Sequence, residues 1–120
     1  MTSRRDLGDF GERVARVHLE AKGYRILETN ARTPEGQVDI VAARDGAVAF
    51  VEVKTRRGDA FGSALEALDD TQAARLLAAA DAYAQEHDNL PPDRRVDLIA
   101  VDLDASGRVL GVEHIEGAVS

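Results

Sequence analysis

The chain has 120 residues, 44% hydrophobic content and a formal net charge of -7. This length suits a single core, and we expect one domain over residues 1–120. No apolar run approaches the ~20 residues that cross a membrane, and the acidic balance argues against nonspecific nucleic-acid binding by the surface as a whole. The absence of cysteine excludes disulfides and thiolate–metal sites and favours a cytoplasmic location.

Two helices and five strands are predicted along the chain. Apolar residues at three- and four-residue spacing predict a helix over residues 7–22, ended by Gly23, and an alanine-rich helix over residues 70–85. Apolar segments between turn residues are predicted as strands: 24–31, 37–43, 47–56, 95–103 and 109–115. The pair Asp45-Gly46 predicts a hairpin between the second and third strands. The order αβββαββ favours helices packed on a mixed sheet.

The third strand carries the most informative residues. Because side chains alternate along a strand, Glu52 and Lys54 share one face. Asp39 belongs to the preceding strand, and the short turn between the two strands can bring its carboxylate beside them. Two carboxylates and a lysine around one point can bind a hard divalent cation and activate water, which is the chemistry of phosphodiester hydrolysis. A surface ion-pair cluster is the alternative interpretation.

The order of elements and motifs resembles the PD-(D/E)XK nuclease superfamily, and more closely the bacterial YraN-type proteins related to archaeal Holliday-junction resolvases. The resemblance covers nearly the whole chain. It rests on these motifs: Gly11-Glu12, Gly23-Tyr24, Asn30-Ala31-Arg32, Gly36-Gln37-Val38-Asp39, Phe50-Val51-Glu52-Val53-Lys54-Thr55-Arg56, Phe61-Gly62 and Val96-Asp97. It implies an α/β, restriction-endonuclease-like fold, in which helices flank a mixed five-stranded sheet. It also implies an endonuclease that depends on Mg²⁺ (or Mn²⁺) and cuts structured, branched DNA during repair or recombination.

The resemblance also implies a role for each matched residue. Asp39 and Glu52 would ligate the metal, and the backbone carbonyl of Val53 would complete the ligand set. Lys54 would position or deprotonate the attacking water. Glu12, from the first helix, stands where a helix-borne acid often joins such sites; an exposed carboxylate near a helix N-terminus is its other interpretation.

Basic and amide side chains close to these motifs are expected to contact nucleic acid: Arg32, Gln37, Arg56, Arg57 and Gln72. Arg44 is expected to add positive charge close to the site. Two positions depart from the family pattern, which usually has Glu in place of Gln37 and commonly a basic residue in place of Gln72. An amide can hydrogen-bond phosphate or water, but it supplies no charge.

These departures leave two further functions open. One is a non-catalytic nucleic-acid-binding protein with a weakened nuclease site, and the other is an interaction protein whose charged cluster is only structural. A homodimer is expected, because resolvase-like enzymes cut two strands and twofold pairing is the commonest assembly.

The three histidines give no second candidate site. His18, His87 and His114 lack the spacing of metal ligands, and we predict that they are structural or solvated. The sequence contains no Ser-His-Asp or Cys-His set and no dinucleotide-binding glycine motif.

Overall fold

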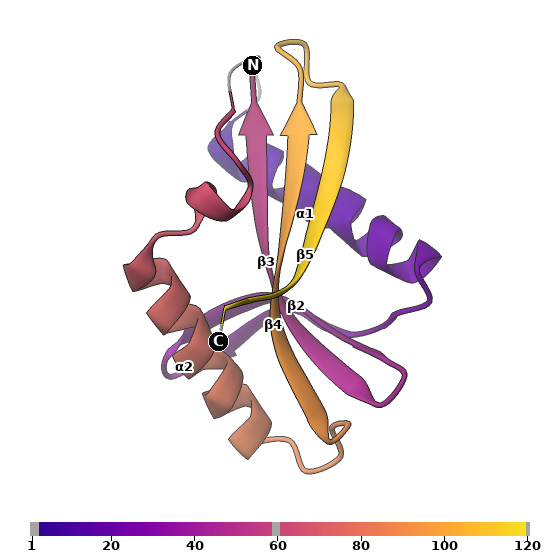
Figure 1. The fold of residues 1–120 in the computed structure, drawn as a ribbon, viewed down its shortest axis with the longest axis vertical. Helices are drawn as coiled ribbons and strands as arrows, with labels where there is room; N and C mark the ends of the chain where they lie inside the picture. Colours follow the sequence, from indigo (N-terminus) through magenta and orange to yellow (C-terminus); the bar gives the residue numbers. More distant parts are fainter. Residues whose placement is uncertain (1–2, 59–60, 120) are drawn as a thin grey trace.

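The computed structural model of the protein describes residues 3–58 and 61–119. These residues form a five-stranded sheet with a helix on each face (Figure 1). The elements in chain order are α1 (Arg4–Ala21), β1 (Arg25–Thr33), β2 (Gly36–Arg44), β3 (Ala47–Arg57), the short 3-10 helix η1 (Leu65–Ala67), α2 (Asp70–Gln85), β4 (Asp93–Leu103) and β5 (Val109–Val119). The predicted order αβββαββ and the mixed, restriction-endonuclease-like sheet are confirmed.

The strands lie side by side in chain order, from β1 to β5. Neighbouring strands are antiparallel except β3 and β4, which are parallel and are joined through α2. The parallel connection explains why a helix separates these two strands, because a parallel pair needs a crossover of a dozen or more residues. The turn at Asp45-Gly46 has positive φ at both residues (52° and 81°), as the predicted hairpin requires.

Most element boundaries differ from the predictions by a few residues. The helix α1 begins at Arg4 rather than at residue 7, because Ser3 caps it: the Ser3 hydroxyl accepts from the Asp6 N–H and the Asp6 carboxylate accepts from the Ser3 N–H. The strands β4 and β5 extend to Asp93 and Val119: Asp93 pairs with Ala47 of β3, and Val119 pairs with Val96 beyond an irregularity in the β4–β5 register. The helix α2 has the predicted bounds.

The core consists of two aliphatic layers, one on each face of the sheet. The helix α1 packs on one face against buried residues of the central strands, among them Ile40, Ala49, Val51 and Ile99. The helix α2 packs on the other face against Val41, Val48, Phe50 and Val96. Within the described residues, neither helix is long and apolar enough to cross a membrane.

Candidate active site

The strands β2 and β3 separate where the two acidic residues lie. Their paired register runs from the hairpin only as far as Ile40 opposite Val51, and Asp39 and Glu52 are the next residue on each strand. Beyond this point the Asp39 carboxylate takes over the role of a backbone partner, because its Oδ2 accepts a hydrogen bond of 2.9 Å from the Val53 N–H. The sheet therefore opens beside two carboxylates.

The backbone of Val53 contributes a third oxygen to this opening. In a strand, the N–H and C=O groups of one residue point to the same side. Since the N–H of Val53 points to Asp39, its carbonyl faces the same gap. Asp39, Glu52 and Val53 line the same hollow. Their roles as metal ligands, which the family resemblance implies, remain predictions.

The positive charge near the two carboxyl groups does not offset the effect of burial on their pKa values. Burial raises the pKa of Glu52 to about 7, and the charge of Asp39 adds to this rise, whereas Lys54 opposes it. Burial also raises the pKa of Asp39, although hydrogen bonds from Val53 and Gln37 act in the other direction. The Lys54 ammonium lies 4.0 Å from Glu52 Oε1. One lysine thus faces two half-buried acids.

A hollow of about 330 Å³ lies between α1 and these strand ends. Glu12 lines it from α1, together with Asp39, Glu52, Asn30 and others. Burial raises the pKa of Glu12, and the charge of Asp39 adds to the rise. Glu12 therefore faces the carboxylate pair across a cleft, as expected, and shares its electrostatic environment.

The neighbouring residue, Gly11, allows α1 to come this close to β3. A Cβ at Gly11 would lie 1.7 Å from Thr55 Oγ1 and 2.9 Å from the Thr55 Cβ, so any side chain there would push the helix away. Thr55 Oγ1 is itself buried and has no hydrogen-bond partner in the described residues. The Gly11-Glu12 motif thus combines a close helix–strand contact with an acid placed over the strand ends.

A second hollow, of about 230 Å³, opens on the α2 side of the same carboxylates. It is lined by Asp39 and Glu52 together with Gln72 and Arg75 of α2 and others. Arg75 was missed in the sequence, although it follows Gln72 by three residues and such neighbours share a helix face. Its aliphatic stem lies over the turn at Gly36, where a Cβ would be 3.4 Å from Arg75 Cγ. Arg75 supplies the basic side chain that position 72 lacks.

Gln72 has a local partner that explains its presence. It is the third residue of α2 and completes a capping box with Asp69: the Gln72 N–H donates to Asp69 Oδ1 at 2.7 Å, and Gln72 Oε1 lies 3.4 Å from the Asp69 nitrogen. A residue at this position that stabilises the helix start need not contact DNA. The contact of Gln72 with nucleic acid stays a prediction.

The expected basic residues are placed in different ways. Arg32, on β1, pairs with Gln37 in the strand register and is exposed. Arg56 forms a two-pronged ion pair with Asp102, at 2.7 and 2.9 Å. Arg57 donates to the carbonyl of Ala105. Arg56 also donates to the carbonyls of Gly62 and Ser63. Asp102 and Ala105 lie more than 40 positions after the arginines that they accept from, which sequence spacing does not reveal.

The expectation that Arg44 adds positive charge to the site is wrong. Arg44 ends β2, five residues beyond Asp39, which at the rise of a strand is roughly 16 Å away. Its guanidinium donates to the carbonyl of Lys22 at 2.9 Å and lies over the ring of Tyr24. Closeness in sequence misleads here because an extended strand carries its two ends far apart.

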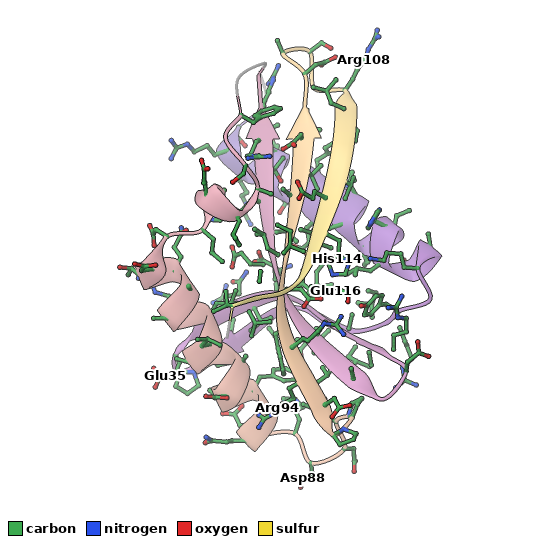
Figure 2. All side chains as sticks on the ribbon, in the orientation of Figure 1. Glu35, Asp88, Arg94, Arg108, His114 and Glu116 are labelled. Atoms are coloured by element: carbon green, nitrogen blue, oxygen red, sulfur yellow. The ribbon has the colours of Figure 1, made fainter. Side chains whose placement is uncertain are left out.

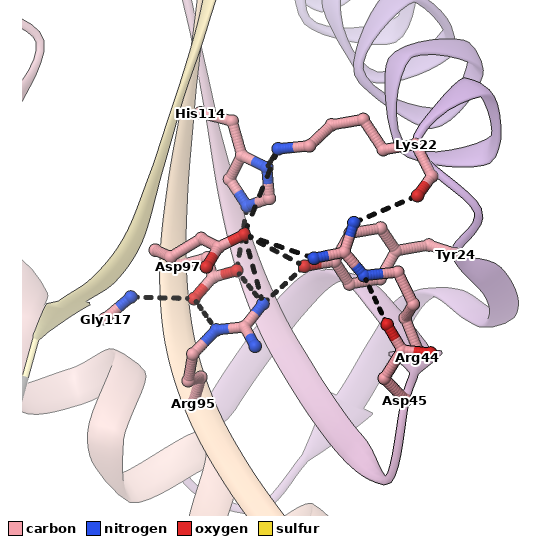
Figure 3. Close-up of polar contacts among 9 residues, drawn as sticks. Lys22, Tyr24, Arg44, Asp45, Arg95, Asp97, His114 and Gly117 are labelled. Atoms are coloured by element: carbon pink, nitrogen blue, oxygen red, sulfur yellow. Dashed lines mark hydrogen bonds and ion pairs between the residues drawn. The ribbon is translucent and has the colours of Figure 1, made fainter.

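Arg44 belongs to a second polar cluster, which we call the Asp97 network. It joins α1, β2, β4 and β5 around a fully buried carboxylate, and His114 and Glu116 reach it from β5 (Figures 2 and 3). Its members are Lys22, Tyr24, Arg44, Arg95, Asp97, His114, Glu116 and Gly117. The predicted structural role of His114 is confirmed by this position, since its side chain is 2% exposed.

The tautomer of His114 follows from its two partners. Lys22 Nζ lies 2.7 Å from His114 Nδ1, and an ammonium can only donate, so Nδ1 accepts. The other nitrogen, Nε2, then carries the hydrogen that is donated to Asp97 Oδ2 at 2.8 Å. Arg95, His114 and the Gly117 N–H therefore all donate hydrogen bonds to Asp97 inside the fold.

The donor set at the strand opening fits a hard divalent cation. Within residues 3–58 and 61–119, no group of three or more His, Cys, Asp or Glu residues is arranged to hold a metal ion. The chain instead offers two carboxylates and a backbone carbonyl. This all-oxygen set is what Mg²⁺ takes, because the ion usually binds through one or two carboxylates and retains several waters.

The fold is of the PD-(D/E)XK nuclease type, and within it an acid on one strand faces a Glu-x-Lys segment on the next. The model of the uncharacterised protein family UPF0102 matches residues 11–101, and the chain belongs to this family. It is 43% identical to a UPF0102 protein of Roseiflexus castenholzii, with 99% of this chain and 98% of the relative covered. The UPF0102 proteins of Moorella thermoacetica (42% identity, 97% of each chain) and Frankia alni (45%, 98% of each) are similar.

Proposed function

We propose that the protein is a cytoplasmic endonuclease that depends on Mg²⁺ (or Mn²⁺) and hydrolyses phosphodiester bonds in structured, branched DNA during repair or recombination. The observation that carries the proposal is the pair of half-buried carboxyl groups of Asp39 and Glu52 at the opening between β2 and β3, both with raised pKa values and with one lysine beside Glu52. Perturbed acids of this kind, in a cleft and beside a lysine, are typical of functional sites.

The metal would be held by the carboxylates of Asp39 and Glu52 and the carbonyl of Val53. When bound, it would supply a positive charge that stabilises the developing charge on the phosphate. Lys54 Nζ, on the same strand face as Glu52, would position the attacking water and exchange a proton with it. Glu12 would orient water from the α1 side of the hollow.

Branched DNA as the substrate class comes from the family resemblance, and the surface is consistent with a local contact. Arg75 lines the hollow on the α2 side, and Arg32 and Gln37 lie on the adjoining strands. The net charge of -7 restricts DNA contact to such local basic positions. A homodimer would place two such sites on two strands of one junction.

The test is cleavage of a panel of junction, flap and duplex DNAs with Mg²⁺ or Mn²⁺. We expect cleavage of a branched DNA by the wild-type protein, and its loss in Lys54→Ala with metal binding retained. Arg94→Ala is the matched control, because Arg94 is exposed and paired with Asp81 far along α2. No cleavage of any DNA by folded protein with either metal would contradict the proposal.

A non-catalytic nucleic-acid-binding protein is the second candidate. It is favoured by the capping role of Gln72 and by the intramolecular partners of Arg56 and Arg57, which leave fewer cations for a tightly bound substrate. It predicts junction binding that persists in EDTA and weakens with salt. The same junction panel with EDTA in one arm separates the two candidates.

A further inference from the structure

A chain of two amide side chains connects Glu12 with Asp39. Asn30 Nδ2 donates to Glu12 Oε1 at 2.9 Å, and Gln37 Nε2 donates to Asn30 Oδ1 at 2.9 Å. The same Gln37 nitrogen lies 3.5 Å from Asp39 Oδ1. We call Asn30 and Gln37 the amide bridge. It spans the hollow between α1 and the strand ends.

The backbone of Asn30 is held in an unusual conformation. Its φ is 52°, in the left-handed region, although its neighbours Thr29 and Ala31 are paired with β2. Apart from glycine, Asn and Asp are the residues that enter this region most readily. The Asn30-Ala31-Arg32 motif thus carries a strained residue whose side chain reaches across to α1.

The direction of the bridge is fixed by chemistry. An ionised carboxylate only accepts hydrogen bonds, so Asn30 must turn its NH₂ group to Glu12. Its carbonyl oxygen then faces residue 37, which must donate. Glutamine can donate there, and an ionised glutamate cannot. The glutamine that departs from the family pattern is therefore matched to Asn30 and Glu12 and does not indicate decay.

We propose that Asn30 is a positioning residue, which holds Glu12 over the candidate metal hollow and requires an amide at position 37. This proposal rests on the proposed function for its link to metal binding, but not for the bridge itself. Partners that orient the groups of a metal site typically change metal affinity 10- to 100-fold when removed.

The bridge is tested without metal, by urea unfolding of Gln37→Glu, Glu12→Gln and the double variant. We expect Gln37→Glu alone to raise the unfolding equilibrium constant roughly tenfold, because two carboxylates then compete for one NH₂ group. In the double variant Asn30 can turn over, donating to Glu at 37 and accepting from Gln at 12, so most of the loss returns. Gln85→Glu, at the exposed end of α2, is the matched control for adding a carboxylate.

The same two single variants and double variant, measured again in the Asn30→Gly protein, distinguish the amide bridge from simple charge repulsion. Glycine keeps the left-handed backbone but removes the side chain. We expect the coupling free energy between the substitutions at positions 12 and 37 to fall sharply when Asn30 is replaced by glycine. An interaction of equal size with and without the Asn30 side chain would overturn the bridge, since repulsion alone would then explain it.

The positioning role is tested by calorimetric titration with Mn²⁺ alone. We expect Asn30→Gly to bind Mn²⁺ at least tenfold more weakly than the wild type, and Asn30→Asp not to restore the affinity, because a carboxylate cannot donate to Glu12. Unchanged affinity in Asn30→Gly would overturn the positioning role. If the wild type binds no Mn²⁺ while the unfolding cycle behaves as expected, the proposed function fails and the bridge stands as a structural feature.

Discussion

Acids on neighbouring strands, the buried Asp97 and the half-buried pair Asp39 and Glu52, have opposite electrostatic environments. Burial alone would raise the pKa of Asp97, but hydrogen bonds from His114, Arg95 and the Gly117 N–H outweigh it and lower the pKa. At the opening between β2 and β3, burial dominates instead, and it raises the pKa of both Asp39 and Glu52.

The difference separates a structural carboxylate from a candidate functional one. Asp97 accepts hydrogen bonds from Arg95 on its own strand and from His114 and the Gly117 N–H on β5, so its negative charge is balanced by donors inside the fold. Asp39 and Glu52 share one lysine at 4.0 Å from Glu52, and so retain a capacity for positive charge from outside. Asp97 is the most deeply buried of the three acids, yet its pKa is the one that is lowered, so the hydrogen-bond partners decide the direction of the shift.

The largest expected effect comes from breaking the Asp97 network. Asp97→Ala leaves Arg95, His114 and the Gly117 N–H without their acceptor, and removing one member of a buried ion pair costs about 3–5 kcal/mol. The free energy of unfolding, measured in urea near pH 8, should fall by this amount. Asp39→Ala, the matched change at the candidate site, should leave apo stability unchanged or raised. Equal losses in the two variants would erase the distinction between the clusters.

A smaller loss is expected where α1 meets β3. Gly11→Ala places a methyl group 1.7 Å from Thr55 Oγ1, and overpacking of this kind costs typically about 1–3 kcal/mol. The change should also displace Glu12 and weaken Mn²⁺ binding, which calorimetry can measure. Thr55→Ala removes the nearest atom and should restore part of both losses. Weakened stability with unchanged Mn²⁺ affinity would show that the contact does not position Glu12.

The sequence predicts contacts between residues that are close along the chain better than contacts between residues that are far apart. Strand alternation and the order of motifs were enough to predict that Asp39 and Glu52 meet, since a hairpin of known register joins them. Asp97 accepts from Arg95, two residues before it, but also from His114 and Gly117 on β5, and its network continues to Lys22, 75 positions away. No local pattern links these residues. The left-handed backbone of Asn30 was likewise not predicted, because the residues on either side of it pair with β2 as in an ordinary strand.

The next expected effect is on the pH dependence of stability, measured on the metal-free protein. Glu52 has a pKa of about 7 when folded, against 4.5 as its ordinary value. Between these values the folded protein holds a proton that the unfolded chain releases, so stability falls as pH rises from about 4.5 to about 7. The loss is up to about 3 kcal/mol, at 1.36 kcal/mol for each pKa unit.

Glu52→Gln should flatten this dependence and make the apo protein more stable than the wild type at pH 8. The raised pKa of Asp39 acts in the same direction and leaves a smaller residual slope. The lowered pKa of Asp97 acts in the opposite direction, but only as pH falls below its ordinary value of 3.8. Urea unfolding at pH 5, 6, 7 and 8 checks this, and a wild-type stability that rises over this range would contradict the environment assigned to Glu52.

The smallest expected effect concerns the positive charge that Arg75 of α2 places beside the candidate site. Arg75 lines the hollow beside Asp39 and Glu52, whereas Arg94 lies by the C-terminal half of α2, where it pairs with Asp81 (Figure 2). If Arg75 contacts a phosphate, Arg75→Ala should reduce the salt slope of junction binding by about one, and Arg94→Ala, which removes the same charge, should not. Binding is measured in EDTA at several salt concentrations, so that no cleavage interferes. Equal slopes for the two variants would mean that net charge alone sets the affinity, and that the hollow on the α2 side does not contact DNA.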